Sequence, residues 1–89
     1  MQFNIHGKQM DIGDALRSHI IEKLEDIDHK YFNRAIEANI TLCPEGHSFT
    51  KTHISIRVGK DIMVMSDAQE NDPYASFDAA CEKLSLIHI

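Results

Sequence analysis

The segment DPYASFDAACEK, residues 72–83, constrains the fold most strongly, because it defines where a helix begins and which side of it is buried. Asp72 suits the N-cap position, since its carboxylate can accept a hydrogen bond from a free amide of the first turn, and Pro73 suits the first helical position. An apolar stripe follows at steps of three and four residues: Tyr74, Phe77, Cys81 and Leu84. We expect the opposite side to carry Ser76, Asp78, Glu82 and Lys83. A helix of this kind must lie on an apolar surface formed elsewhere in the chain.

The beginning of the chain predicts a short strand followed by a long helix. Phe3 and Ile5 alternate with polar residues, which is typical of a strand with one buried face, and Gly7 interrupts the pattern. Asp11 is the expected N-cap of the helix. The helix has its own apolar stripe: Ile12, Leu16, Ile20, Leu24 and Ile27. We expect it to end near residues 29–30.

Three strands are expected between the two helices. The first has inward-facing residues that alternate with polar ones: Ile36, Ala38, Ile40 and Leu42. Residues 44–46 have the composition of a turn. The next strand alternates from Thr52 to Val58, and Gly59-Lys60 favours a tight hairpin turn after it. The last strand covers residues 61–65 and is followed by a polar loop, residues 66–71.

This order of strand, helix, three strands and helix predicts an α+β fold. The consecutive strands should form an antiparallel meander, and both helices should bury their stripes side by side on one face of the sheet. We therefore expect residues 1–89 to form a single domain, a two-layer β-α-β-β-β-α sandwich with a four-stranded sheet. The other face of the sheet is expected to meet solvent or a partner.

The composition narrows the class of protein. Apolar residues make up 43% and charged residues 26% of the chain, which is ordinary for a soluble globular domain. The opening residues lack the apolar run of a signal peptide and no segment is long enough to span a bilayer, so a cytoplasmic location without membrane contact is expected. The net charge of −5 argues against a nucleic-acid binder, although it leaves room for a local basic patch.

No motif indicates an enzyme, a metal site or a cofactor. The six histidines lack the spacing of known zinc motifs, and Cys43 with His47 at one turn supplies too few ligands for structural zinc. Cys81 lies on a helical stripe and is expected to be a small core residue, and neither cysteine is expected to form a disulfide. We interpret three carboxylates before the last helix as capping groups and as partners of the helix dipole: Asp67, Glu70 and Asp72.

Basic side chains are the remaining candidates for a functional site. At helical spacing, His19, Lys23 and Lys30 lie on one border of the first helix's stripe and Arg17 lies on the other. The outer face of this helix is acidic, and lysine stems on such a border can simply cover the edge of the core. The complete candidate set is sparse: Arg17, Lys23, Lys30, Arg57 and Lys83.

Along nearly its whole length the chain resembles the ribosome hibernation-promoting factors, also called ribosome-associated inhibitors or sigma-factor modulation proteins. The opening strand ends in Gly7, a helix carrying Lys23-Leu24 follows, and the meander comes next. The most specific match is the family's acidic loop and the motif after it: Asp72, Tyr74, Ala75, Phe77, Asp78, Lys83 and Leu84.

The resemblance implies a fold similar to that of double-stranded RNA-binding domains and a protein without catalysis, cofactor or small-molecule substrate. It also implies binding to the small ribosomal subunit in the decoding channel, at the tRNA and mRNA sites, which silences and protects idle ribosomes under stress or in stationary phase. Family members contact ribosomal RNA phosphates mainly through basic residues of the two helices, a role that falls here on Lys23 and Lys83. Weaker candidates are Arg17, Lys30 and Arg57, which we expect on the same faces.

The C-terminus departs from the family pattern. Members usually continue the last helix with Lys and Arg, and longer members add a C-terminal domain that pairs two ribosomes, whereas this chain ends in LSLIHI, residues 84–89. That hexapeptide is what results from translating a transposon end used to prepare sequencing libraries, so we interpret it as a non-native tail. The alternative is a genuinely short protein with an apolar last turn. Either way, we expect weak ribosome binding and a final helix that frays.

A protein-interaction module with the same fold is the alternative function. In that interpretation the open sheet face, including Met63 or Met65 and His53, meets a protein partner such as a second copy of the chain. The methionines can equally be half-covered by neighbouring side chains. Salt separates the two functions, since phosphate binding weakens steeply with salt and an apolar interface does not.

Overall fold

The computed structural model describes residues 2–32, 35–59 and 62–87, and of these the side chains of 31–32 and 85–87 are not described. Its elements in chain order are β1 (Gln2–Gly7), α1 (Asp14–Ile27), a π-helical turn (Asp28–Phe32), β2 (Ala35–Glu45), β3 (Phe49–Val58), β4 (Ile62–Glu70) and α2 (Pro73–Ile87). The strands form one sheet in the order β1-β2-β3-β4, in which the β1–β2 pair is parallel and the β2–β3 and β3–β4 pairs are antiparallel. The predicted β-α-β-β-β-α order and the antiparallel meander are confirmed.

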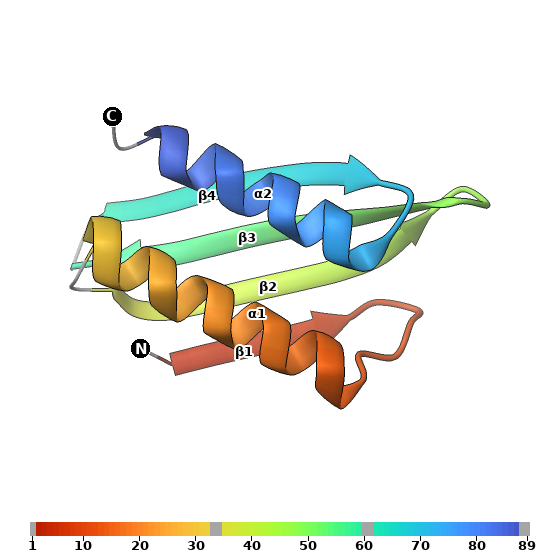
Figure 1. Ribbon diagram of the computed structural model, residues 1–89, viewed down its shortest axis with the longest axis horizontal. Coiled ribbons are helices and arrows are strands. Elements are labelled where there is room, and N and C mark those ends of the chain that lie inside the picture. The colour runs from red at the N-terminus through yellow and green to blue at the C-terminus, as the bar shows by residue number, and fades with distance from the viewer. Residues whose placement is uncertain (1, 33–34, 60–61, 88–89) are drawn as a thin grey trace.

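Both helices lie on the same face of the sheet, α1 running across β2 and β1 and α2 across β4 and β3 (Figure 1). The core lies between the layers, and full burial of one Leu or Ile side chain contributes about 1.5–3 kcal/mol. Each helix supplies a buried stripe: Leu16, Ile20, Leu24 and Ile27 from α1, and Phe77, Ala80, Cys81 and Leu84 from α2. The sheet supplies the facing residues: Ala38, Ile40, Leu42, Ile54, Ile56, Val64 and Ala68.

The start of α1 differs from the prediction. Gly13, not Asp11, is the N-cap, and its carbonyl accepts the first helical hydrogen bond from the Arg17 amide at 3.0 Å. The chain follows β2 for one residue beyond β1, since the Lys8 amide donates to the Leu42 carbonyl at 2.8 Å. The chain between β1 and α1 must therefore change direction before α1 can run back along the sheet (Figure 1). At the other end helical structure continues through the π-helical turn to Phe32, slightly further than expected.

One of the four predicted inward-facing residues of β2 is not buried. Ile36 is 51% exposed, whereas Ala38 and the two apolar residues after it on the same face are fully buried. The pairing of β2 with β3 shifts between Ala35 and Glu37, which takes Ile36 out of the regular alternation.

The turns of the meander lie partly where they were expected. Pro44 and Glu45, predicted as turn residues, are paired with Thr50 and Phe49 in the β2–β3 ladder, so the turn begins only at Gly46. Gly46 has a φ of 72°, which favours glycine. Of the predicted Gly59-Lys60 turn, Gly59 has the positive φ that was expected, 79°, while Lys60 lies outside the described residues.

The predicted polar loop at residues 66–71 is mostly strand, because β4 continues to Glu70 and pairs with β3 throughout. Ser66 fits into this strand because its small side chain faces the helices and its hydroxyl donates a hydrogen bond to the Ala80 carbonyl at 2.8 Å. Ser76, predicted on the solvent side of α2, is fully buried instead, and its hydroxyl lies 2.7 Å from that of Thr52. Hydroxyls that find partners of this kind can be buried at little cost.

Two further predictions concern the ends of elements and the membrane. α2 extends to Ile87, and the last two residues of the predicted tail, His88 and Ile89, lie outside the described part of the chain. Within the described residues, neither α1 nor α2 has the length and apolar character that crossing a membrane requires.

Candidate nucleic-acid interface

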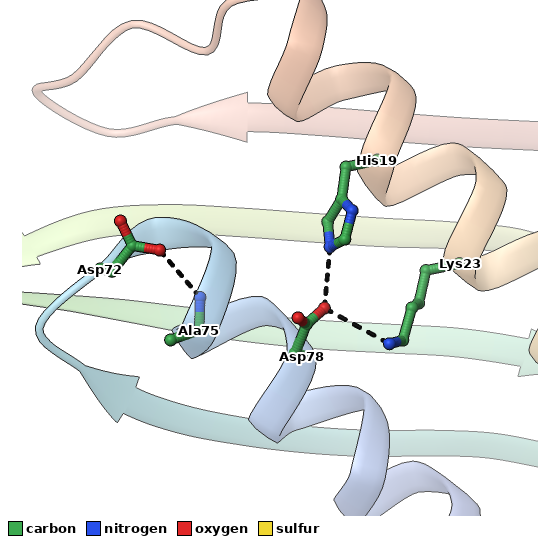
Figure 2. Close-up of polar contacts among 5 residues, drawn as sticks. All are labelled: His19, Lys23, Asp72, Ala75 and Asp78. Carbon is green, nitrogen blue, oxygen red and sulfur yellow. Dashed lines mark hydrogen bonds and ion pairs between the residues drawn. The ribbon is translucent and has the colours of Figure 1, made fainter.

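The N-terminus of α2 is fixed by the cap that the sequence predicts. The Asp72 carboxylate accepts a hydrogen bond from the Ala75 amide at 3.1 Å (Figure 2), and the Asp72 carbonyl accepts one from the Ser76 amide at 2.8 Å. Pro73 is the first helical residue. Because the helix start is fixed in this way, the residues of its second turn face α1 in a defined position.

Two α1 side chains converge on one carboxylate of α2 at the junction of the helices (Figure 2). His19 Nε2 lies 2.8 Å and Lys23 Nζ lies 3.6 Å from the same oxygen, Oδ1 of Asp78. The first distance is a hydrogen bond, while the second is an ion pair too long for one. The three side chains are 32%, 43% and 41% exposed, respectively, so the cluster lies at the surface of the helix layer.

The imidazole of His19 is held by two aromatic rings as well as by Asp78. Its ring centroid lies 5.1 Å from that of Tyr74 and 5.8 Å from that of Phe77, both in edge-on orientation. Phe77 is fully buried and Tyr74 is partly exposed, so His19 covers the edge of the core. Edge-to-face contacts of aromatic rings are favourable, and together with the hydrogen bond they fix the orientation of the imidazole.

Cys81 lies beneath this cluster and confirms the prediction of a core cysteine, with only 1% of its surface exposed. Burial raises the pKa of its thiol to about 12, an effect that the nearby Lys23 opposes and Asp78 reinforces. The thiol is therefore neutral at physiological pH and is a poor nucleophile and metal ligand. Among the described residues, no three His, Cys, Asp or Glu side chains gather closely enough to hold a metal ion.

The other predicted site residues are spread over the molecule. Lys83 Nζ donates to the backbone carbonyl of Asp67 on β4 at 2.7 Å, which ties its ammonium group to the β4 side of α2. Lys30 pairs with Asp26, four residues earlier, at 3.2 Å. Arg17 is exposed near the start of α1. Surface pairs of this kind are weak, so these cations can exchange partners at small cost.

Arg57 lies on the face of the sheet opposite the helices, so the expectation that it shares their surface is wrong. Its neighbour Ile56 is buried under the helix layer, and successive side chains of a strand point to opposite faces. Within the ladder Arg57 lies between Glu37 and Met63.

The carboxylates before α2 do not act as a group. Asp72 caps the helix, but Asp67 is a strand residue whose Oδ2 lies 3.8 Å from His53 Nδ1 on the open sheet face. Glu70 is the last residue of β4 and pairs with Thr50. The interpretation of all three as capping groups is therefore correct only for Asp72.

The convergence of His19 and Lys23 on Asp78 was not predicted. The spacing of four residues between His19 and Lys23 indicated that both lie on one border of α1. Nothing in the sequence indicated that Asp78, 59 residues away from His19, approaches that border. The family motif includes Asp78, but it did not indicate which side chains this residue contacts.

The chain is a small α+β domain. On the exposed side of its helices, basic side chains lie beside carboxylates, as in the pairs of Lys23 with Asp78 and Lys30 with Asp26. The chain belongs to the family described as sigma 54 modulation protein / S30EA ribosomal protein, whose profile matches residues 3–85.

Two relatives illustrate the extent of the similarity. The chain is 30% identical over 84 residues to a ribosome hibernation promotion factor of Rhizobium meliloti (strain 1021), a match that covers 94% of this chain and 44% of the relative. It is 31% identical over 84 residues to a ribosome hibernation promoting factor of Azotobacter vinelandii, covering 94% of this chain and 76% of the relative. The chain thus spans less than half the length of the first relative and about three quarters of the second.

Solved structures share the fold. The N-terminal domain of Thermus thermophilus Protein Y superposes with a TM-score of 0.84 at 22% identity, covering 98% of this chain and 94% of that one. A ribosomal subunit interface protein from Coxiella burnetii gives a TM-score of 0.85 at 19% identity, covering 99% and 93%. At these identities the likeness supports the architecture alone.

Proposed function

We propose that residues 1–89 form a ribosome-binding domain that acts as a hibernation factor in the cytoplasm. In this proposal the domain binds the small ribosomal subunit in the decoding channel and occupies the tRNA and mRNA sites, which inhibits translation under stress or in stationary phase. The observation that carries the proposal is the match of residues 3–85 to a family whose relatives are ribosome hibernation factors. No catalytic step is needed, since occupancy of the channel is sufficient.

The proposed contact to ribosomal RNA uses Lys23 and Lys83 first. Both are exposed on the helix layer, and their intramolecular partners, a carboxylate at 3.6 Å and a backbone carbonyl, can be replaced by phosphate oxygens. Arg17 on α1 and Lys30 on the π-helical turn after it can extend this contact. A domain inserted into a channel meets RNA on more than one side, so Arg57 can contribute from the open sheet face.

The charge of the chain limits the strength of this contact. The net charge is −5, and carboxylates are interspersed with the cations of the helix layer. Each phosphate neutralised by a cation contributes roughly −0.7 to −0.9 to the slope of log affinity against log salt, so two lysines give a slope of about −1.4 to −1.8. We therefore expect binding that is measurable at low salt and weak at physiological salt.

Co-sedimentation with purified small ribosomal subunits at low and physiological salt tests the proposal. The wild-type chain is expected to sediment with the subunits at low salt, and the Lys23→Glu, Lys83→Glu variant is expected to stay in the supernatant. A matched control, Lys8→Glu with Lys51→Glu, makes the same charge change at two exposed lysines outside the helices and is expected to retain binding. Equal loss in both variants would contradict a contact through the helices, and no binding by the wild type at low salt would contradict ribosome binding by this chain.

The open sheet face supports a second candidate function, a protein-interaction surface that includes self-association into a homodimer. Met63 and Met65 on β4 are 51% and 55% exposed, on the same face as His53 and Asp67. Size-exclusion chromatography with light scattering tests this: a dimer that resists salt and is lost in a Met63→Lys, Met65→Lys variant would favour it over RNA binding.

A further inference from the structure

We propose that Asp78 is an internal counter-ion at the α1–α2 junction, which occupies the place of an RNA phosphate and thereby weakens the attraction of Lys23 and His19 for that phosphate. The identity of the natural ligand as RNA rests on the proposed function. The prediction that the junction binds anions is independent of the proposed function, because it follows from the contacts of His19, Lys23 and Asp78.

The geometry of the cluster resembles that of an occupied anion site. Two nitrogen-bearing side chains, from adjacent turns of α1, approach a single oxygen of Asp78 at 2.8 Å and 3.6 Å (Figure 2). A phosphate oxygen accepts hydrogen bonds from lysine and histidine in the same way as a carboxylate oxygen does. All three side chains are between 32% and 43% exposed, so a phosphate can reach the lysine from solvent without an opening of the core.

The two α1 side chains differ in how firmly they are held. His19 is fixed by a short hydrogen bond to Asp78 and by the rings of Tyr74 and Phe77. Lys23 is held to Asp78 by an ion pair beyond hydrogen-bonding distance, on a flexible four-carbon stem. Exposed ion pairs of this kind are among the weakest interactions in a protein. Lys23 is therefore the group that can leave Asp78 for a phosphate, while His19 keeps Asp78 in place.

The carboxylate charge determines the direction of the effect. The charges of Lys23 and Asp78 offset each other, so the ion pair presents no net positive charge to an approaching phosphate. Replacing Asp78 by Asn removes the negative charge and retains a side chain of the same shape that can still hydrogen-bond to His19. The variant is thus expected to bind anions more tightly, although it loses an ion pair.

Glu82 offers a matched control for this charge change. It lies on the same helix one turn beyond Asp78, is exposed, and forms no ion pair among the residues that the structure describes. Glu82→Gln and Asp78→Asn raise the net charge by the same amount, and only Asp78→Asn affects the pair with Lys23.

The test is an NMR titration of the folded chain with tripolyphosphate at low salt. The Asp78→Asn variant is expected to bind roughly two- to fivefold more tightly than the wild type, with the largest shifts at His19 and Lys23, and Glu82→Gln is expected to change affinity by less. The gain should disappear when Lys23→Gln is added to Asp78→Asn. Binding by Asp78→Asn that is no tighter than binding by Glu82→Gln would overturn the proposal, as would a gain that persists without Lys23.

Circular dichroism shows whether each variant is folded, and Asp78→Ser replaces Asp78→Asn in the same titration if the latter does not fold. Co-sedimentation with small ribosomal subunits separates this inference from the proposed function. Tighter tripolyphosphate binding without subunit binding would leave the counter-ion role intact and refute ribosome binding. Subunit binding that Asp78→Asn does not strengthen, together with unchanged tripolyphosphate binding, would refute the counter-ion role alone.

Discussion

Thr52 and Ser76 form a buried hydroxyl pair in the mostly apolar contact between α2 and the sheet. Both residues are fully buried, their hydroxyl oxygens are 2.7 Å apart, and Ser76 also lies within 3.2 Å of the Ala68 carbonyl. Among the described residues, every buried side-chain nitrogen and oxygen has a hydrogen-bond partner. At the scale of single residues, the described core therefore contains small polar side chains, and each of their buried polar atoms has a hydrogen-bond partner.

This pair gives a prediction with an internal control. Ser76→Ala should lower the free energy of unfolding by about 1–3 kcal/mol, because it leaves the Thr52 hydroxyl buried without this partner. Replacing both residues, with Thr52→Val added to Ser76→Ala, should recover much of that loss, since no hydroxyl then remains unpaired. Urea unfolding of the wild type, the Ser76→Ala and Thr52→Val single variants and the double variant measures both effects. A double variant that is less stable by the sum of the two single losses would show that the pair is not coupled.

The two helices begin in different ways at the scale of elements. α2 has a side-chain cap from Asp72, whereas α1 has Gly13 at its N-cap, a residue without a side chain that could cap the first turn. Gly13 has an extended backbone, φ −74° and ψ 169°, which any residue can adopt, and a Cβ added there would meet no atom within 4 Å. Gly7 is different, since a Cβ added there would overlap the backbone carbonyl oxygen of Met10 and would lie 3.0 Å from the Ile12 side chain.

The uncapped start of α1 predicts a stabilising substitution. Gly13→Ser should raise the free energy of unfolding by a few tenths of a kcal/mol, because serine can accept a hydrogen bond from an amide of the first turn. Gly13→Ala, which adds a Cβ without a cap, should be less stable than Gly13→Ser by about 1 kcal/mol. Thermal and urea unfolding compare the three chains. Equal stability of the serine and alanine variants would argue against a capping effect.

At the scale of the whole molecule, the core and the protonation of Cys81 are linked. The raised pKa of Cys81, about 12 against an ordinary 9.0, means that folding favours the protonated thiol. The resulting contribution to stability is fully present below pH 9.0 and is lost as the pH rises toward about 12, because the unfolded chain releases the proton first.

Stability should therefore fall in alkaline solution. For this group alone, the free energy of unfolding is expected to decrease by about 1.4 kcal/mol between about pH 8 and about pH 10. Cys81→Ala should be less stable at both pH values, because it leaves a space in the core, but should lack this part of the pH dependence. Urea unfolding at the two pH values gives the comparison. A pH dependence as steep in Cys81→Ala as in the wild type would assign the effect to other groups.

The order of the elements, the antiparallel meander, the α2 cap and most of the two buried stripes could be read from the sequence. Two predicted stripe residues differ, since Tyr74 is 38% exposed and Ile12 precedes α1 and is only half-buried. Periodicity and capping are local properties, carried by neighbouring residues such as Asp72 and Pro73 or by the stripe from Leu16 to Ile27. The errors have a tertiary cause. Ser66 and Ser76 were assigned to solvent from their polarity, and they are buried because each finds a hydrogen-bond partner on another element.

The candidate site divides in the same way. The family motif in the sequence indicated Lys23 and Lys83, and helical spacing placed His19 beside Lys23. Only the tertiary structure shows that Asp78 contacts this pair and that Arg57 lies on the opposite face of the sheet. It also shows the hydrogen bond from Lys83 to β4. The physical reason is distance along the chain: short-range spacing determines which side of a helix a residue faces, whereas the packing of α1 beside α2 determines which charges meet.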